Sequence, residues 1–546
     1  MHVSAEARTA SPAGTLGRNG LWLGVAGCTA AVGAFLLVQL TAWPPHEDET
    51  LALFVGRKSL PGLFDTVLGE RGGAPLHFLF AWIVAHAGGG LTELRLVSAL
   101  FAIASVPAVA ALGVRLAGRD AALAGTALVS AGWMLLFHGI YGRMYSLFLF
   151  TSTLSYLALL KATERGGRRA WAIWAAAVLL AVASHPYGAL VLASQAVFVL
   201  LARARPRGAI PAFAAVAALG VPFWRTDIVL AGRFDVGVGG GGEKLGGPGS
   251  VLRYLERVAS DFTAGYAAVV TIVLLLALVG LVHLARARPR GALLAAAAIG
   301  TPTAALMLAR LGSSTSPESR HLIFALPVFA VLVADGILRA AGAASHRLEP
   351  TIAALAVVAL LPAEIAWGWH KTPQLYTGEP SARIAARDEA AAWLAATSRS
   401  DDVLFGYEPL YLEAWERGGG ISLRVVPRAD SKLAFNELMG APKPLGRGIW
   451  VFDASETNNF VRHEAIPLRY PEPASAFEAR AYGPYLVIRT RHPTVTVRGY
   501  LKMARRAQLV GKSLVIGDAD VNLVTVLQAS GRLARYERDS RSTVSR

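Results

Sequence analysis

Long apolar runs are the feature that most constrains this chain. A helix needs about 20 apolar residues to cross the hydrocarbon core of a bilayer, and the run from Leu21 to Trp43 reaches that length. Ten further runs are centred near residues 105, 130, 154, 178, 195, 216, 273, 300, 330 and 360. Charged residues make up only 16% of the sequence, whereas a soluble domain carries about 25%. The pattern predicts a polytopic α-helical membrane protein with about eleven transmembrane helices.

The first apolar run has two interpretations. A secretory signal peptide has an apolar core of about 7–15 residues and a small-residue cleavage site. The run from Leu21 is longer and ends in Trp43-Pro44-Pro45. We therefore predict an uncleaved first transmembrane helix, preceded by a cytoplasmic tail at residues 1–20.

Clustered basic residues set the expected orientation. They group at Arg115 and Arg119, at Lys161, Arg165, Arg168 and Arg169, at Arg203, Arg205 and Arg207, at Arg286, Arg288 and Arg290, and at Arg339 and Arg347. These groups fall in every second loop, and loops rich in Lys and Arg face the cytoplasm. We expect a multi-pass protein of a bacterial cytoplasmic (inner) membrane with its N-terminus inside. Topology then explains much of the net charge of +16, so no nucleic-acid partner is invoked.

The short apolar segment at residues 75–88 is the ambiguous one. If it crossed the membrane, every later loop would invert and the basic groups would face outward. A helix that lies in the membrane interface avoids this conflict. We predict the interfacial helix, within a first outer loop at residues 44–92.

The composition changes after Trp369. Short strand-like segments alternate along the chain with helix-like segments. The predicted strands lie at 402–407, 423–428, 448–454 and 485–490, and the predicted helices at 382–396, 410–416 and 520–529. The sequence therefore predicts a transmembrane domain at residues 21–369 and a soluble α/β domain at 370–546, outside the membrane. The latter carries 25 Lys and Arg against 19 Asp and Glu. Such a balance suits an anionic glycan, a membrane surface or ordinary solubilising charge.

Polar residues gather on the expected outer face. They occur in PPHEDET (44–50), FHGIYGRMYS (137–146), SHPYG (184–188) and SPESRH (316–321). Interfacial anchoring is the simpler explanation for any single Tyr or Arg. A carboxylate can instead act as a general base toward a hydroxyl, and arginines can hold a phosphate by forked hydrogen bonds. The residues alone indicate chemistry on a lipid-linked phosphate and leave its type open.

Several segments, in order, are similar to those of a known family. They are PPHEDET, GAPLHFLFAWI, LRLVSALFAIASVPAVAALG, GRMYSLFLF and SRHLIFALPVFA, within residues 20–345. They resemble the GT-C superfamily of integral-membrane glycosyltransferases. The likeness is greatest to the dolichyl- and polyprenyl-phosphate-mannose dependent mannosyltransferases and the lipid A aminoarabinose transferases. The resemblance implies an inverting transfer outside the membrane, from a polyprenyl-phosphate sugar donor.

The resemblance also implies roles for the acids and arginines. Asp48 matches the family's first-loop aspartate, the expected general base, and Glu49 is the second acid of the pair. Arg95 and Arg320 match arginines suited to the carrier phosphate. Arg143 belongs to an RxY-type segment expected near the substrates.

The remaining candidates are aromatic or imidazole side chains expected to bind substrate. Tyr145 completes the RxY-type segment, and His185 and Tyr187 match a turn that carries such residues in some relatives. His77 lies in the interfacial helix. His321 stands where an aromatic residue is usual, which is a departure from the family pattern.

The predicted function is therefore transfer of a sugar, mannose or similar, to a glycan, lipid or protein acceptor. The expected partners are the polyprenyl-phosphate sugar and membrane lipids. No metal site or other cofactor is predicted, although some GT-C enzymes use a divalent ion. A transporter or flippase of lipid-linked glycan is the alternative. It should place ionisable residues deep within spans, and the span centres look almost free of charge. A third reading, a glycan-binding scaffold, does not need eleven spans.

Overall fold

The computed structural model describes residues 17–202, 208–234, 247–309, 318–406, 410, 424–427, 430–453 and 476–515. The chain divides into two compact units, described here one at a time. The first unit comprises Met1–Trp43 and Val67–Thr377, and the second comprises Pro44–Thr66 and Gly378–Arg546. These bounds differ from the domain bounds predicted from the sequence. Residues 44–66 are expected in the transmembrane domain, but they group with the C-terminal residues. Apart from Leu410, the expected helices at 410–416 and 520–529 lie outside the described residues.

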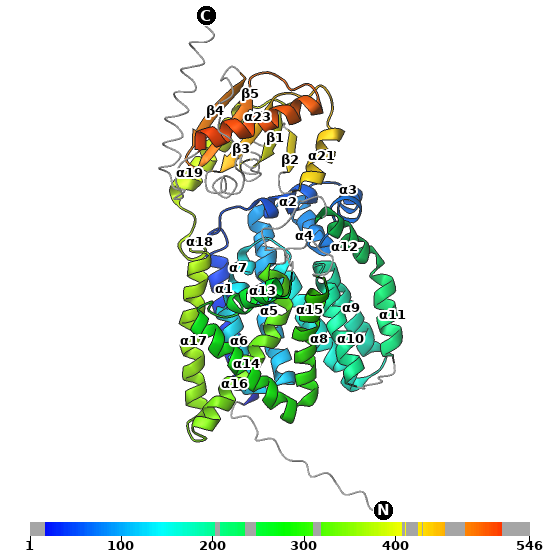
Figure 1. Cartoon of the computed structure of the whole chain (residues 1–546), viewed down its shortest axis with the longest axis vertical. Coiled ribbons are helices and arrows are strands. Elements are labelled where there is room, and N and C mark those ends of the chain that lie inside the picture. Colours follow the sequence, from blue (N-terminus) through cyan, green and yellow to red (C-terminus); the bar gives the residue numbers. More distant parts are fainter. Residues whose placement is uncertain are drawn as a thin grey trace, which may run out of the picture. The chain divides into compact units, whose positions relative to one another are not determined.

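The first unit is helical (Figure 1). Its helices begin with α1 (Arg18–Val38), the π-helix η1 (Thr66–Arg71, from the unit boundary), α4 (Pro75–His86), α5 (Leu91–Leu116), α6 (Arg119–Ala131), α7 (Trp133–Ile140), α8 (Tyr145–Arg165), α9 (Arg168–Ser184) and α10 (Gly188–Leu201). They continue with α11 (Ala209–Leu219), α12 (Val221–Phe234), α13 (Pro248–Asp261), α14 (Ala267–Ala287), α15 (Pro289–Ala309), the 3₁₀ helix η2 (Ser319–Ala325), α16 (Leu326–Ala344), α17 (Glu349–Lys371) and α18 (Gln374–Thr377).

Each of the eleven expected apolar runs is helical. By length and composition, seven helices of the described residues could cross a membrane, or nine if the bent pairs α6 with α7 and α11 with α12 each count once. Helices α9 and α10 have 17 and 14 residues, which is short of the roughly 20 that a span needs. The chain is thus a multi-pass membrane protein, and the figure of about eleven crossings stays a prediction. Helix α4 has 12 residues, so its interfacial position also stays a prediction.

Helix α16 forms the centre of the first unit. With η2, its apolar window is 83% buried inside the unit, against 22% for the windows of α1 and α17. Small residues let it approach α14 closely. A Cβ added at Gly336 would lie 1.9 Å from the carbonyl oxygen of Leu276, and one at Gly280 would lie 2.0 Å from that of Leu332. Larger residues at either glycine would separate the two helices.

Hydrogen bonds between buried side chains join α8, α9 and α10. The indole Nε1–H of Trp174 donates to Gln195 Oε1 at 2.7 Å, and Gln195 Nε2 donates to Ser155 Oγ at 2.7 Å. These polar groups satisfy one another where bilayer lipid offers no partner.

Two carboxylates lie within apolar helices, which corrects the expectation that the span centres are almost free of charge. Asp335 in α16 is 1% exposed, and its Oδ2 lies 2.7 Å from Nδ1 of His283 in α14. Glu364 in α17 is 6% exposed. Neither acid is evident from the hydropathy of the sequence, because a single acid barely lowers the mean hydropathy of a long apolar run.

The second unit contains a five-stranded mixed sheet in the order β2-β1-β3-β5-β4. Its strands are β1 (Val403–Gly406), β2 (Arg424–Pro427), β3 (Gly448–Asp453), β4 (Phe477–Tyr482) and β5 (Tyr485–Thr490), and its helices are α2 (Glu47–Gly56), α3 (Leu60–Asp65), α19 (Ser381–Thr397), α21 (Ser431–Gly440) and α23 (Val497–Val515). β1 pairs in parallel with β2 and β3, whereas β5 pairs antiparallel with β3 and β4. The four predicted strands and the helix at 382–396 are confirmed, and β4, α21 and α23 are additions.

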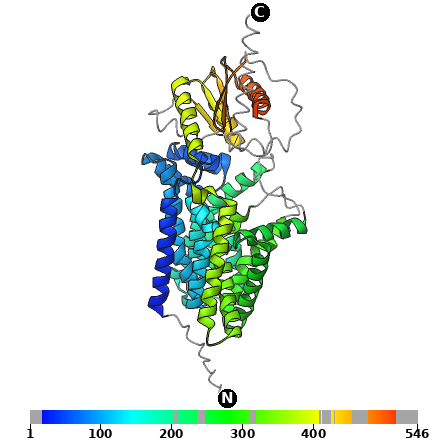
Figure 2. The ribbon, with the colours of Figure 1, turned by 90° about the vertical axis from the view of Figure 1, so that its left-hand side faces the viewer.

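Alternating side chains bury both faces of this sheet. Trp450 and Ile488 point to the face that packs with Tyr500 of α23. Ile449 and Val487 point to the other face, which packs with α19 and with Phe54 of α2. Figure 2 shows α19 and α23 on opposite faces of the sheet. Burial on both faces explains why β1, β3 and β5 read as nearly continuous apolar runs.

Candidate functional site

Seven residues at the ends of helices of the first unit form what we call the basic aromatic cluster. They are His138, Arg143, Tyr145, His185, Tyr187, Arg320 and His321. One segment runs from α7 into the start of α8, a second is the turn between α9 and α10, and the third is η2. The structure thus brings together six predicted site residues and adds His138. The sequence showed His138 in the same loop but offered no reason to select it.

The rings of the cluster lie against one another. The centroid of Tyr145 is 4.7 Å from that of His138 and 5.6 Å from that of His185. His321 lies 5.4 Å from His185 and 5.2 Å from Tyr187. The side chains therefore support each other, which fixes their directions more tightly than loop residues on a surface.

Arg320 sits on this layer of rings. Its Cζ lies 5.1 Å from the centroid of Tyr145, within the range of a cation–π interaction. Its Nη2 donates to the carboxylate of Glu318 at 2.8 Å. Because Arg320 and Glu318 are 21% and 32% exposed, this ion pair is reachable by a ligand, unlike a fully buried one.

Two histidines of the cluster accept a backbone hydrogen bond at the same ring nitrogen, Nδ1. The backbone N–H of Tyr187 donates to Nδ1 of His185 at 3.0 Å, and that of Glu318 donates to Nδ1 of His321 at 3.1 Å. A neutral imidazole that accepts at Nδ1 carries its proton on Nε2. Each ring therefore offers one N–H donor. Burial, and then the charges of Arg143 and Arg320, lower the pKa of His185 to about 3, so this ring is neutral at physiological pH.

His138 is buried completely, and neither of its ring nitrogens has a hydrogen-bond partner within the described ranges. An unpaired polar group in such a place costs free energy unless a ligand or water satisfies it. With two guanidinium groups and two imidazole N–H groups nearby, the cluster has the donors that an anion such as a phosphate ester needs.

Buried contacts hold η2, the segment that carries Arg320 and His321. The hydroxyl of Tyr254 in α13 donates to the carbonyl of Glu318 at 3.0 Å. The hydroxyl of Ser319 donates to Oδ2 of Asp261, at the end of α13. The other oxygen of Asp261 lies 3.1 Å from Nζ of Lys371, at the end of α17. Asp261 thus ties both α13 and α17 to the start of η2, which no sequence signal indicated.

Arg95 has a structural contact where the sequence predicts a phosphate ligand. It is 2% exposed, and its Nη1 donates to the carbonyls of Trp43 at 2.7 Å and of Leu40 at 3.4 Å. One turn later in α5, Ser98 donates to the carbonyl of Arg143 at 3.3 Å. These bonds fix the end of the first apolar run and the approach to the basic aromatic cluster. The predicted role of Arg95 as a phosphate ligand stays a prediction.

His77 lies in α4 and is 4% exposed. Its ring stands edge-on to Phe78 at 5.7 Å, and the guanidinium of Arg71 lies 4.6 Å over the same Phe78 ring. One contact of His77 is thus with its own helix, and its predicted role toward substrate stays a prediction.

Asp48 and Glu49 belong to the second unit, in the first turn of α2. Oε2 of Glu49 accepts from the backbone N–H of His46 at 3.0 Å, and Nδ1 of His46 accepts from the N–H of Asp48 at 3.2 Å. This is a capping arrangement in which the side chains satisfy N–H groups at the helix start. Glu49 is fully buried, whereas the Asp48 side chain is 25% exposed. Of the two acids, Asp48 is the one that a substrate can reach.

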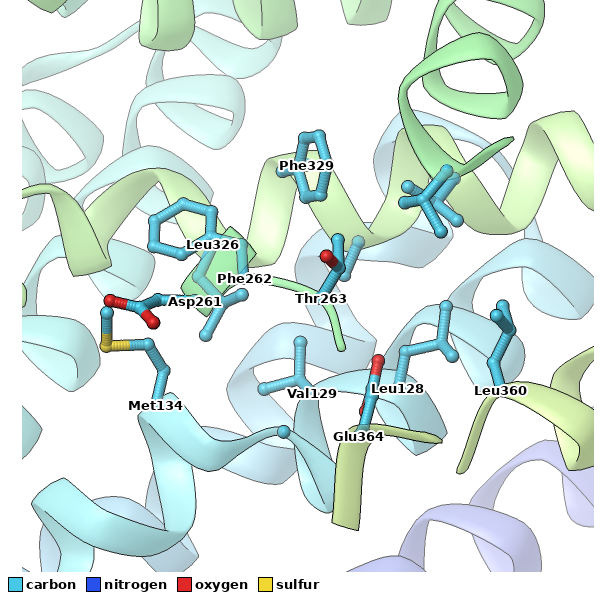
Figure 3. Close-up of a pocket in the computed structure, with 14 residues that line it drawn as sticks. Leu128, Val129, Met134, Asp261, Phe262, Thr263, Leu326, Phe329, Leu360 and Glu364 are labelled. Carbon is cyan, nitrogen blue, oxygen red and sulfur yellow. The ribbon is translucent and has the colours of Figure 1, made fainter. Parts of the chain in front are cut away.

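A small cavity lies within the first unit, among α6, α13, α16 and α17 (Figure 3). Its volume is about 20 Å³, which accommodates about one water molecule. Figure 3 shows the carboxyl groups of Asp261 and Glu364 and the hydroxyl of Thr263 among apolar side chains. Oε2 of Glu364 has no hydrogen-bond partner in the part of the chain that the structure describes. Over that same part, no three His, Cys, Asp or Glu side chains are grouped as metal ligands would be.

Comparisons with known proteins bear on the fold. No protein-family model and no curated protein sequence matches the chain. Among solved structures, it is similar to the crystal structure of the apo form of the Archaeoglobus fulgidus oligosaccharyltransferase. The TM-score is 0.51 at 10% identity, over 80% of this chain and 70% of that chain. Since the identity is so low, the likeness shows the fold alone.

Two further crystal structures of the same archaeal protein match with a TM-score of 0.49 each. One is its complex with zinc and sulfate, at 15% identity over 78% of this chain and 68% of that one. The other carries a disulfide-tethered acceptor peptide with an NVT sequon, at 12% identity over 79% and 69%. The likeness to the apo structure shows a similar overall fold, and membership of the GT-C superfamily stays a prediction. The mannosyltransferase and aminoarabinose transferase branch stays a prediction.

Proposed function

We propose that the chain is an inverting glycosyltransferase. It moves a sugar, mannose or similar, from a polyprenyl-phosphate carrier to an acceptor on the outer side of the bacterial cytoplasmic membrane. The basic aromatic cluster is the observation that carries the proposal. Two arginines and two imidazole N–H donors lie there, in a chain whose fold is similar to that of the archaeal oligosaccharyltransferase.

The proposed reaction needs a base and an anion site. The carboxylate of Asp48 takes the proton of the acceptor hydroxyl. The hydroxyl oxygen attacks the anomeric carbon on the face opposite the phosphate, so the configuration inverts. The anomeric C–O bond breaks, and its electron pair stays on the phosphate oxygen. Arg320, Arg143 and the Nε2–H groups of the histidines stabilise the charge that develops on this phosphate.

The remaining predicted residues are assigned supporting roles. Glu49, through its bond to His46, orients the first turn of α2 and hence Asp48. Tyr187 is partly exposed and offers its ring to a sugar, whereas Tyr145 is buried beneath Arg320 and supports that arginine at the cluster. The donor's prenyl chain is expected to stay in the bilayer beside the first unit. The acceptor is a glycan, a lipid or a protein.

The test uses the full chain in lipid nanodiscs and a panel of radiolabelled polyprenyl-phosphate sugars. The wild type should release the label from one donor, and Asp48→Asn should abolish release while donor binding remains. Glu47→Gln is the matched control, because it removes a carboxylate from the same helix turn and should leave turnover unchanged. Normal turnover by Asp48→Asn would remove this residue from the mechanism.

A transporter of lipid-linked glycan is the second candidate, favoured by one observation. Asp335 and Glu364 are buried acids within apolar helices, and ionisable groups in such positions often mark transport pathways. In proteoliposomes, a transporter would move the intact lipid-linked glycan between leaflets without cleaving it. Flux that disappears in Glu364→Gln, with no sugar release from any donor, would replace the enzyme proposal.

A further inference from the structure

The helix α23 carries a row of exposed cations on the second unit. Its inner side, with Tyr500, Ala507 and Val510, is buried against the sheet. Its outer side exposes Arg498, Lys502 and Arg505, at spacings that place them on one side of a helix. The 19 residues of α23 include no Asp or Glu. The row therefore has no acid of its own helix to neutralise it.

The row differs from six other cations of the unit that carboxylates engage. These are Lys58 with Glu437, Arg383 with Asp453, Arg387 with Glu379, Arg447 with Asp402, and Arg480 and Arg489 with Glu478. In contrast, none of Arg498, Lys502 and Arg505 has a hydrogen bond or an ion pair with any residue that the structure describes. Three neighbouring cations on one side of a helix, none of them engaged by the residues that the structure describes, point to an external anion.

The spacing of the row fits an extended ligand. Residues 498 and 505 are seven positions apart, which is about 10 Å along the axis of a helix. Three charges over that length match a linear chain with repeated anionic groups better than one small anion. The exposed apolar side chains of Leu501 (46%) and Val495 (51%) lie beside the row and can contact the apolar face of a sugar ring.

Two other polyanions fit less well. An amphipathic helix binds a bilayer by burying its apolar face among the lipids, but the apolar face of α23 already packs on the sheet. Single-stranded nucleic acid is held by stacking on aromatic side chains. The exposed residues of α23 between Arg498 and Gln508 include none.

We infer that this row binds a linear anionic glycan, one that carries carboxylate or phosphodiester groups along its length. The basic excess of the C-terminal region is then a binding feature rather than only solubilising charge. Binding requires no donor and no transfer step, so the inference is independent of the proposed glycosyltransferase activity.

The test measures binding of a fluorescent polymannuronate oligomer to the full chain in zwitterionic phosphatidylcholine nanodiscs. A triple variant, Arg498→Gln with Lys502→Gln and Arg505→Gln, should bind at least about tenfold more weakly. Its affinity should also depend less on salt, because fewer counterions are released. All three side chains are exposed, so the fold of the sheet should be retained, which hydrogen exchange of β3 and β5 would verify.

Matched single variants give the control. Lys502→Gln should weaken binding several-fold, whereas Arg399→Gln, which removes an exposed cation outside the row, should change it less than about twofold. Equal effects of these two changes would show nonspecific attraction and overturn the inference. It would also be overturned by unchanged binding in the triple variant, or by no binding in the wild type. Equal affinity for neutral dextran, or tighter binding to single-stranded DNA or phosphatidylglycerol vesicles, would overturn it as well.

Discussion

The two units use arginine in different ways. In the second unit, Arg447 and Arg383 donate to Asp402 and Asp453, carboxylates that are completely buried. In the first unit, Arg320 lies on the ring of Tyr145, and its acidic partner Glu318 is partly exposed and directly precedes the short helix η2. The first arrangement leaves no room for exchange with a ligand. The second keeps a cation next to neutral donors, where a bound anion can compete for it.

Loss of a buried pair in the second unit should have the largest effect. Asp402 accepts from Nη2 of Arg447 at 2.6 Å, from Nε of the same residue at 3.0 Å, and from its backbone N–H at 3.0 Å. Asp402→Ala leaves this guanidinium buried without its partner, which should destabilise the unit by about 3–5 kcal/mol. Hydrogen exchange of the β1 and β3 amides in the full chain would measure the change.

The control for that prediction is an exposed pair in the first unit. Arg115 and Glu164 form an ion pair of 2.6 Å with side chains 26% and 46% exposed. Glu164→Gln should cost less than about 1 kcal/mol, because water solvates both groups. If the two substitutions cost the same, burial does not explain the difference between the units.

Arg320→Ala should have the next largest effect, on ligand binding rather than on stability. We expect donor affinity to fall by about 2–5 kcal/mol if the guanidinium holds the carrier phosphate, while exchange of the second unit's amides stays unchanged. Donor binding to nanodiscs measures it, with Arg339→Ala as a control cation of the same unit. Unchanged donor affinity would show that Arg320 does not hold the carrier phosphate.

Asp261 should act through η2 and therefore more weakly. Asp261→Asn removes the charge that Lys371 contacts and weakens the bond to Ser319, so Arg320 becomes less well positioned. We expect the KM for donor to rise about tenfold, or about 1.4 kcal/mol, with kcat changed less than about threefold. Asp335→Asn, another buried acid of this unit, should lower thermal stability without this rise in KM. A parallel rise in both variants would indicate a general structural effect.

The smallest expected effect is a pH-dependent change in stability that comes from Glu478, in the edge strand β4. Burial opposes ionisation of Glu478, but its bonds to Arg489 and Arg480 lower its pKa below the ordinary value of 4.5. A lowered pKa contributes stability that is present above pH 4.5 and lost as the pH falls through the folded value. The Tm of wild type should therefore exceed that of Glu478→Gln by a few degrees at pH 7, and the difference should vanish toward pH 3. An equal difference at both values would exclude the ion pairs as its source.

The sequence predicts the elements better than their contacts. The apolar runs and the strands at Val403–Gly406 and Tyr485–Thr490 could be recognised, because length and side-chain type determine them locally. Strand β4, FEARAY, was missed because Glu478 and Arg480 alternate with its apolar residues. Those charges pair with each other, and Glu478 also pairs with Arg489 of β5, which becomes visible only once the strands are placed side by side.

The same limit applies to the candidate site. Topology and family resemblance selected Arg143, Arg320 and most of the rings, because these lie at helix ends on the expected outer face. The bond from Ser319 to Asp261 spans 58 positions, and nothing in either local sequence indicates it. Likewise, whether Arg95 holds a ligand or a carbonyl depends on where the end of α1 lies. Composition cannot tell these two uses of arginine apart.

The backbone bonds to His185 and His321 have a consequence for the cost of binding. Each bond fixes both the rotation of the imidazole and the position of its proton before any ligand arrives. Ordering a flexible side chain on association costs about 0.5–1.5 kcal/mol of binding free energy. These two rings are already ordered by folding, so most of that cost does not fall on binding. The same rigidity makes the pair selective. Each fixed Nε2–H group favours a ligand that accepts a hydrogen bond and disfavours one that must donate to this nitrogen.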